Sequence, residues 1–128
     1  MTCGMLFDLS KAFDTVNHEI LIGKLEHYGI RGLALELFKS YLSDRKQYVH
    51  LNNHKSQTRP ISCGVPQGSV LGPLFFLIFI NDLPNCSHLG YFRIFADDTN
   101  VFFHVNNIKE VILFAKLIMT ALYSWFRL

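Results

Sequence analysis

The sequence predicts an α+β domain in which a small antiparallel sheet has helices packed on one face. The expected elements run in the order strand, two helices, hairpin, helix, second hairpin and last helix. Hairpins pair antiparallel, and this order lacks the regular strand–helix alternation that a doubly wound parallel sheet requires. Half of the 128 residues are hydrophobic, 14% are aromatic and 17% are charged, so the chain can bury the core of one domain.

The first part of the chain predicts a strand followed by two helices. Residues 3–9 form a short apolar run interrupted by one aspartate, which is typical of a buried strand. Asn17 can cap a helix that Gly29 ends. The apolar positions of that helix follow the helical period and are Ile20, Leu21, Leu25 and Tyr28. Apolar pairs predict a second helix from Leu33 up to Asp44.

The middle of the chain predicts a hairpin, a loop and a buried helix. Residues 47–51 and 56–61 flank the polar segment Asn52-Asn53-His54-Lys55, which indicates a hairpin. A loop punctuated by glycine and proline covers residues 63–69. The apolar helix that follows runs from about Val70 to Asn81, and its most apolar stretch is too short to span a bilayer.

The last part predicts a second hairpin and an amphipathic helix. Residues 91–96 and 100–105 are expected to be strands on either side of Asp97-Asp98. Asn107 with Glu110 resembles a capping box at the start of a final helix that carries one apolar stripe. Both ends of the sequence suggest a fragment of a longer chain, because neither has the polar residues that are typical of the ends of a natural domain.

Charge and cysteine content narrow the functional classes. The chain has 12 Lys and Arg against 10 Asp and Glu, a net charge of +2, so any basic surface for nucleic acid must be local. Its three cysteines are widely spaced, which argues against a disulfide framework or a zinc site and favours an intracellular setting, nucleus or cytoplasm. The N-terminal segment MTCGMLFDLS has no basic region, so the sequence predicts neither secretion nor a membrane partner.

Three aspartates interrupt apolar runs. They are Asp8, Asp97 and Asp98. An unpaired buried carboxylate costs several kcal/mol, and adjacent carboxylates repel unless a cation lies between them. If Asp97 and Asp98 lie in a turn that faces Asp8, the group suits two divalent ions such as Mg²⁺. The alternatives are an ordinary polar turn at 97–98 and a buried Asp8 satisfied by backbone donors.

The segment Gly64 to Pro73 contains several glycines and two prolines and leads directly into a helix. Glycine lets a backbone approach a ligand closely, and a helix N-terminus offers free N–H groups to an anion. The alternative is an ordinary loop that caps the helix.

Together these segments resemble the non-LTR (LINE-type) retrotransposon reverse transcriptases. Residues 7–14 (FDLSKAFD) resemble motif A, residues 64–73 resemble motif B and residues 95–98 (FADD) resemble motif C. Residues 79–84 (FINDLP) match the run that follows motif B. The resemblance covers nearly the whole chain and implies the palm core of an RNA-directed DNA polymerase, with fingers and thumb missing from residues 1–128.

The resemblance also implies roles for individual residues. Asp8 and Asp97, with the backbone carbonyl of Leu9, would hold two Mg²⁺ ions, for which Mn²⁺ is an alternative, and Asp98 would support the site. Gln67 and Gly68 match the motif B pair that lines the nucleotide pocket. Phe13 falls where the family places an aromatic steric gate against the ribose 2′-hydroxyl, and its other interpretation is core packing. The implied partners are an RNA template with a DNA primer and dNTPs, and the resemblance does not define an oligomeric state.

A local basic surface lies between the motif A and motif B segments. From Arg45 to Asn81 the sequence has no acidic residue. The four cations of this stretch are candidates for phosphate contacts and are Arg45, Lys46, Lys55 and Arg59. The alternative is a solvated hairpin edge, where such charges discourage edge-to-edge pairing.

Two other functions compete with the polymerase palm. One is a non-catalytic retrotransposon relic that binds nucleic acid or a protein. The other is an RNA-dependent RNA polymerase palm, against which the string FADD and the bulky Phe13 argue. Because the triphosphate clamp and the duplex grip of the family lie outside this sequence, the fragment alone is expected to be inactive in primer extension.

Overall fold

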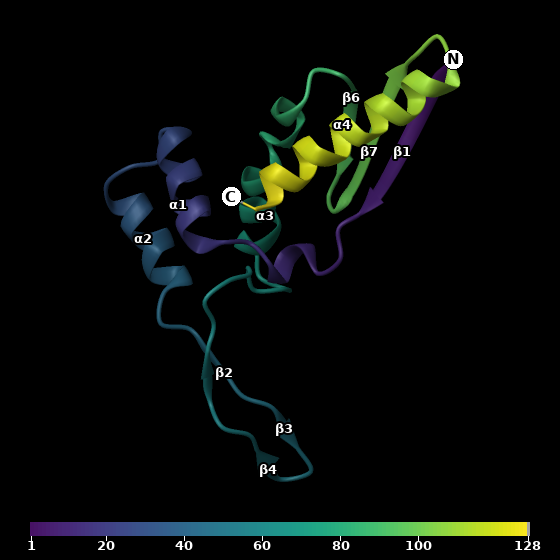
Figure 1. The fold of residues 1–128 in the computed structure, drawn as a ribbon. Helices are drawn as coiled ribbons and strands as arrows, with labels where there is room; N and C mark the ends of the chain where they lie inside the picture. Colours follow the sequence, from purple (N-terminus) through teal and green to yellow (C-terminus); the bar gives the residue numbers. More distant parts are fainter. Residues whose placement is uncertain (128) are drawn as a thin grey trace. The chain divides into compact units, whose positions relative to one another are not determined.

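The computed structural model describes residues 1–127 and confirms the α+β class, with helices and small antiparallel sheets (Figure 1). The chain forms two compact units. The sheet unit contains Met1–Lys11 and the chain from Ile80 to the end of the described residues, and the helical unit contains Ala12–Phe79.

The sheet unit is built on three antiparallel strands in the order β1-β7-β6. These are β1 (Thr2–Asp8), β6 (Tyr91–Phe95) and β7 (Asp98–His104). Exposure alternates along the central strand β7, where Thr99, Val101 and Phe103 are buried. The apolar and polar residues therefore divide between two faces, as the period of a strand requires.

One face of this sheet is covered by α4 (Ile108–Phe126), with a short 3₁₀ turn, η2 (Leu83–Cys86), against the helix. The rings of Phe103 and Phe114 lie with centroids 6.2 Å apart. A Cβ added to Gly90 would lie 2.4 Å from Val101 Cγ1 and 3.4 Å from Ile118 Cδ1, so the strand start and α4 are closely packed there. As predicted, Asn107 caps α4: its Oδ1 accepts from the Glu110 amide at 3.0 Å.

The turn between β6 and β7 differs from the sequence prediction. The strands close at the pair Phe95–Asp98, so the turn residues are Ala96 and Asp97, not Asp97 and Asp98. Ala96 takes a φ of 51°, and a positive φ at the first position of a two-residue hairpin matches the right-handed twist of the strands. Asp98 is therefore the first residue of a strand, which begins two residues before the predicted start at Asn100.

The helical unit contains η1 (Ala12–Asp14), α1 (His18–His27), α2 (Leu33–Leu42) and all but the last residue of α3 (Leu71–Ile80). Asn17 caps α1 as predicted, since its Oδ1 accepts from the amides of Glu19 and Ile20 at 2.9 and 3.1 Å. Gly29, at φ 90°, follows the end of this helix.

Helices α2 and α3 meet around a fully buried ring. Phe75 has no exposed surface, and the rings of Phe38 and Tyr41 contact it edge-on at centroid distances of 5.1 and 5.9 Å. Lys24 of α1 donates to the carbonyl of Phe79, near the end of α3, at 2.6 Å. A cation at the end of a helix satisfies its last carbonyls and complements the helix dipole.

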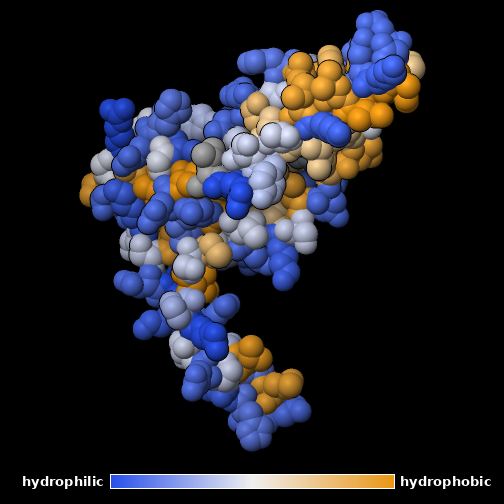
Figure 2. Space-filling view, viewed as in Figure 1, coloured by the Kyte–Doolittle hydropathy of each residue, from blue (hydrophilic) through white to orange (hydrophobic). Residues whose placement is uncertain are grey.

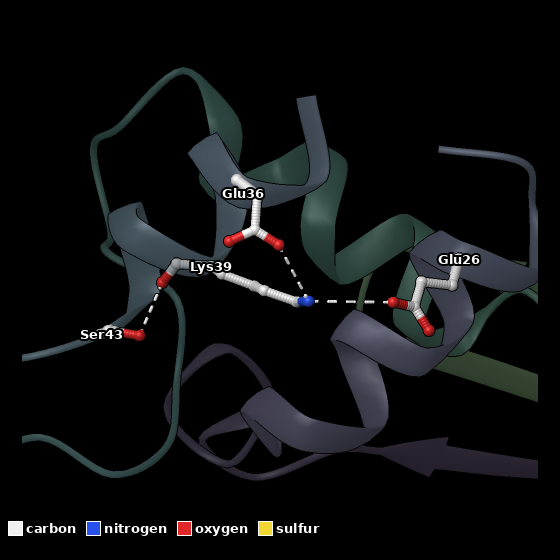
Figure 3. A network of polar contacts seen from close by, with 4 residues as sticks. All are labelled: Glu26, Glu36, Lys39 and Ser43. Carbon is white, nitrogen blue, oxygen red and sulfur yellow. Dashed lines mark hydrogen bonds and ion pairs between the residues drawn. The ribbon is translucent and has the colours of Figure 1, made fainter. Parts of the chain in front are cut away.

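Figure 3 shows the polar contacts that join α1 and α2 on the surface. Lys39 Nζ lies 3.2 Å from Glu36 Oε1 on its own helix and 3.9 Å from Glu26 Oε1 of α1. Ser43 Oγ donates to the carbonyl of Lys39 at 2.7 Å and so closes the end of α2. Exposed pairs of this kind contribute less than about 1 kcal/mol, so buried leucines carry most of the packing here.

The predicted hairpin after α2 is a long two-stranded arm, residues 46–60, which we call the ribbon. It pairs β2 (Lys46–Gln47) with β5 (Arg59–Pro60) and β3 (His50–Leu51) with β4 (His54–Lys55). Its turn is Asn52-Asn53, with φ of 47° and 63°, which corrects the predicted four-residue loop 52–55. Every residue of the ribbon is exposed, and Figure 2 shows it as mostly hydrophilic with hydrophobic residues toward the tip.

Candidate active site

Two of the three predicted carboxylates are direct neighbours in the sheet. Asp8 is the last residue of β1, Asp98 is the first residue of β7, and the two are register partners. Directly opposite residues of an antiparallel pair point to the same face, with Cβ atoms about 4.5–5.5 Å apart. Both side chains lie on the exposed face, away from α4, and Phe95 adjoins Asp98 on the other side. The third carboxylate, Asp97, is half-buried in the adjacent turn.

The carboxylates are not neutralised within the described chain. Among residues 1–127, no side chain forms an ion pair or hydrogen bond with Asp8, Asp97 or Asp98, and no group of three or more His, Cys, Asp or Glu is gathered closely enough to hold a metal ion. Two like charges opposite each other in a sheet repel, and a divalent cation removes that repulsion. Paired carboxylate oxygens are the donors that Mg²⁺ prefers, so the chemistry of the pair fits such an ion.

The opposite face of the same strand ends borders an apolar cavity of about 190 Å³. Phe7 and Thr99, which are register partners next to Asp8 and Asp98, line it together with Leu9 and the C-terminal half of α4. The hydroxyl of Thr99 is buried and has no hydrogen-bond partner among the described residues. An unsatisfied buried hydroxyl costs free energy of folding, so Thr99 lowers the stability of the sheet unit.

In the helical unit, the end of the motif A segment is hydrogen-bonded to the motif B loop. The amides of Gly64 and Val65 donate to the carbonyls of Val16 and Phe13, both at 2.8 Å. Asn17 and Cys63 form an isolated antiparallel bridge. These contacts join two segments that lie about fifty residues apart in sequence into one local structure.

Gly64 is the closest point of this junction. Its φ is 86°, and a Cβ there would lie 2.8 Å from the carbonyl oxygen of Asp14 and 2.9 Å from its Cα. His18 Nε2 lies 2.7 Å from the carbonyl oxygen of Gly64 and secures the same turn. Only glycine combines this left-handed conformation with such a close backbone approach.

Within the motif B loop, Gln67 and Gly68 are exposed. Gln67 Nε2 donates to Asp14 Oδ1 at 2.9 Å. Gly68 has a φ of 77°, and apart from its two chain neighbours no described residue comes within 4 Å of a Cβ built there. The sequence assigned no chemistry to Asp14, and its hydrogen bond to Gln67 is a contact between side chains 53 residues apart.

Phe13 is half-buried and stacks on Phe76 of α3, with ring centroids 4.5 Å apart and an interplanar angle of 28°. Phe76 is itself 2% exposed. One face of the Phe13 ring is therefore held by the core while part of the ring stays accessible. Sequence reasoning missed Phe76, whose only signal was its place in an apolar helix.

The predicted basic residues separate into two groups. Lys46, Lys55 and Arg59 are exposed on the ribbon. Arg45 is half-buried at its base: its Nη1 donates to the carbonyl of Tyr41 at 3.4 Å, and its guanidinium lies 5.4 Å from the Tyr41 ring centroid. Lys55 Nζ lies 5.4 Å from the centroid of the Tyr48 ring on the same ribbon, and Arg45 anchors the base of the ribbon to α2.

Comparison with known proteins decides the family. Residues 1–127 match the family described as reverse transcriptase (RNA-dependent DNA polymerase). This chain belongs to the reverse transcriptase family. Within residues 1–127, no helix is long and apolar enough to cross a membrane.

Three of the relatives are proteins of Drosophila mobile elements. The chain is 36% identical to a probable RNA-directed DNA polymerase from transposon BS of Drosophila melanogaster, over 96% of this chain and 14% of the relative. It is 41% identical to the RNA-directed DNA polymerase from mobile element jockey of the same species, over 63% of this chain and 9% of the relative. It is 36% identical to a probable RNA-directed DNA polymerase from transposon X-element of the same species, over 77% of this chain and 11% of the relative. The chain therefore spans about a seventh or less of the length of these relatives.

Proposed function

We propose that this chain is the palm core of an RNA-directed DNA polymerase that adds dNTPs to the 3′ end of a DNA primer on an RNA template. The observation that carries the proposal is the register pairing of Asp8 with Asp98 at adjoining strand ends, with Asp97 in the neighbouring turn. Nucleotidyl transfer needs carboxylates that converge from separate segments of the chain. Membership of the reverse transcriptase family supports the same activity.

In this proposal Asp8 and Asp97, with the backbone carbonyl of Leu9, hold two Mg²⁺ ions, and Asp98 supports the site. When bound, the ions would supply positive charge for the primer 3′-hydroxyl and for the departing pyrophosphate. Asp8 and Asp98 are exposed at the strand ends and Asp97 is half-buried in the turn, so the first two carboxylates are open to such ligands. The primer 3′-hydroxyl releases its proton to solvent as its oxygen bonds to the α-phosphorus of the dNTP, and the bond from that phosphorus to pyrophosphate breaks.

The helical unit contributes the nucleotide and nucleic-acid contacts of the proposal. Gln67 and Gly68 line the nucleotide pocket, and the left-handed, uncrowded backbone at Gly68 leaves room for a ligand there. Phe13, whose ring stacks on Phe76, excludes the 2′-hydroxyl of a ribonucleotide. Lys46, Lys55 and Arg59 on the ribbon contact backbone phosphates, an interaction that weakens with salt.

The test is the thermal stability of the chain as MgCl₂ or MnCl₂ is added. A ligand that binds only the folded state stabilises it by about 2.7 kcal/mol at one hundred times its Kd. We expect the melting temperature of the wild type to rise with either ion and that of Asp8→Asn not to rise. Asp44→Asn is the matched control, because Asp44 is an exposed aspartate with a positive φ that asparagine tolerates.

Two results separate the polymerase palm from a relic that only binds nucleic acid or a protein. A stabilisation that requires Asp8 supports the palm, and so does weaker binding of a dNTP when Gln67 is replaced. If neither ion shifts the wild-type melting temperature, or if Asp8→Asn shifts as much as the wild type, the palm assignment is wrong and the binding module stands in its place.

A further inference from the structure

We propose that Asp14 is a positioning residue that orients the Gln67 side chain toward the nucleotide. The inference rests on the proposed function, because it concerns how the same nucleotide pocket is held. Its basis is the hydrogen bond from Gln67 Nε2 to Asp14 Oδ1 at 2.9 Å. Both residues are exposed, so the contact is not a by-product of core packing.

The chemistry of the pair fixes which end of the amide is free. A carboxylate only accepts hydrogen bonds, whereas a carboxamide has a donor end and an acceptor end. Asp14 must therefore face the Nε2 end of Gln67, and the Oε1 end points away from Asp14. That leaves an acceptor oxygen for an O–H or N–H donor of the nucleotide, and a fixed amide binds with a smaller loss of rotamer entropy.

The backbone around Asp14 is fixed by contacts with the motif B loop. Gly64 packs directly on the Asp14 backbone, where a Cβ would be 2.8 Å from the carbonyl oxygen. The flanking residue Phe13 accepts from the amide of Val65, and Val16 accepts from the amide of Gly64. The carboxylate and the loop that carries Gln67 thus belong to one hydrogen-bonded junction, so the distance between them is set by the backbone.

The experiment measures the affinity of the chain for a dNTP in the presence of Mg²⁺ by equilibrium dialysis. We expect Asp14→Ala to weaken binding about three- to tenfold, the size of one lost hydrogen bond. Asp14→Asn keeps an acceptor oxygen at the same place and is expected to restore most of the affinity. A double variant, Asp14→Ala with Gln67→Ala, is expected to bind no more weakly than Gln67→Ala alone, because Asp14 acts through Gln67.

Controls separate this effect from general damage. Glu36→Ala removes another exposed, hydrogen-bonded carboxylate of the same unit and is expected to leave dNTP affinity unchanged. The melting temperature of each variant shows that it is folded. In addition, the side-chain amide resonances of Gln67 in a ¹⁵N spectrum are expected to shift in Asp14→Ala and to stay near their wild-type positions in Asp14→Asn.

The outcomes are distinguishable. If Gln67→Ala weakens dNTP binding but Asp14→Ala does not, the proposed function stands and the positioning role is wrong. If the losses of the two single variants multiply in the double variant, Asp14 acts independently of Gln67 and the inference is again wrong. If Gln67→Ala leaves dNTP affinity unchanged, the nucleotide role of Gln67 in the proposed function is wrong, and the positioning role of Asp14 is wrong with it.

Discussion

Asp8 of β1 and Asp98 of β7 are directly opposite each other at the end of the antiparallel pair. Their carboxylates occupy the same face, so the fold holds two negative charges side by side. Like charges directly opposite in a sheet are destabilising by up to about 1 kcal/mol. The arrangement is a cost to folding that a cation bound between the two carboxylates would remove.

This repulsion predicts that Asp98→Asn stabilises the metal-free chain. We expect its free energy of unfolding, measured in EDTA and low salt, to exceed that of the wild type by up to about 1 kcal/mol. The gain should shrink in high salt, which screens exposed charges. Asp44→Asn, on the other unit, serves as the control, and equal gains in the two variants would contradict the prediction.

The buried hydroxyl of Thr99 predicts a second stabilising substitution. Thr99 is 1% exposed, and its Oγ1 has no partner within residues 1–127. Thr99→Val replaces the hydroxyl by a methyl group of similar shape and removes the cost of an unsatisfied polar atom. We expect chemical denaturation to show a gain of about 1 kcal/mol. The control is Thr58→Val on the exposed ribbon, which should change stability by less than about 0.5 kcal/mol. A loss of stability in Thr99→Val would mean that the hydroxyl is satisfied.

Two glycines of the helical unit form a matched pair. Gly64→Ala combines a positive φ with a Cβ 2.8 Å from a backbone oxygen, so we expect a loss of more than about 1 kcal/mol. Gly23 lies inside α1, and outside that helix's own backbone no described residue comes within 4 Å of a Cβ built there. We expect Gly23→Ala to stabilise the helix by about 0.5–1 kcal/mol. Urea melts of both variants test the prediction, and a tolerated Gly64→Ala would show that the junction with Asp14 is loose.

The accessible part of the Phe13 ring predicts sugar selection. In a complete polymerase that contains this chain, we expect Phe13→Ala to relax discrimination against ribonucleotides while dNTP incorporation is largely kept, because the ring excludes a 2′-hydroxyl sterically. The measurement is kcat/KM for matched dNTP and rNTP pairs. Phe38→Ala removes another half-buried ring that contacts the core of the same unit, so it should lower stability without changing the ratio. An unchanged ratio in Phe13→Ala, with a lowered melting temperature, would make Phe13 a core residue only.

The sequence predicted those parts of the fold that local chemistry determines. The Asn17 cap and the Asn107 cap follow from side-chain oxygens that reach amides within three residues. The order of strands and helices follows from apolar periodicity. The first strand also follows locally from its apolar run, although it spans Thr2–Asp8 and not the predicted residues 3–9.

The sequence does not predict strand register or long-range contacts. The second turn is Ala96-Asp97 because the pair Phe95–Asp98 closes the strands, and pairing is a property of two segments. The ribbon turn is two residues long because His54 pairs with Leu51, whereas the sequence pattern predicts His54 in the loop. In the same way, neither the support of Phe13 by Phe76 nor the bond between Asp14 and Gln67 has a local signal.

The ribbon has a consequence for how this protein tolerates change. Since every residue from 46 to 60 is exposed, the core places almost no demand on the identity of those side chains. The Asn52-Asn53 turn, whose left-handed backbone favours asparagine or glycine, is the one strong local requirement. We therefore expect substitutions in this arm, and changes in its length, to be nearly neutral for folding, so that its side chains can differ between related chains without loss of the fold.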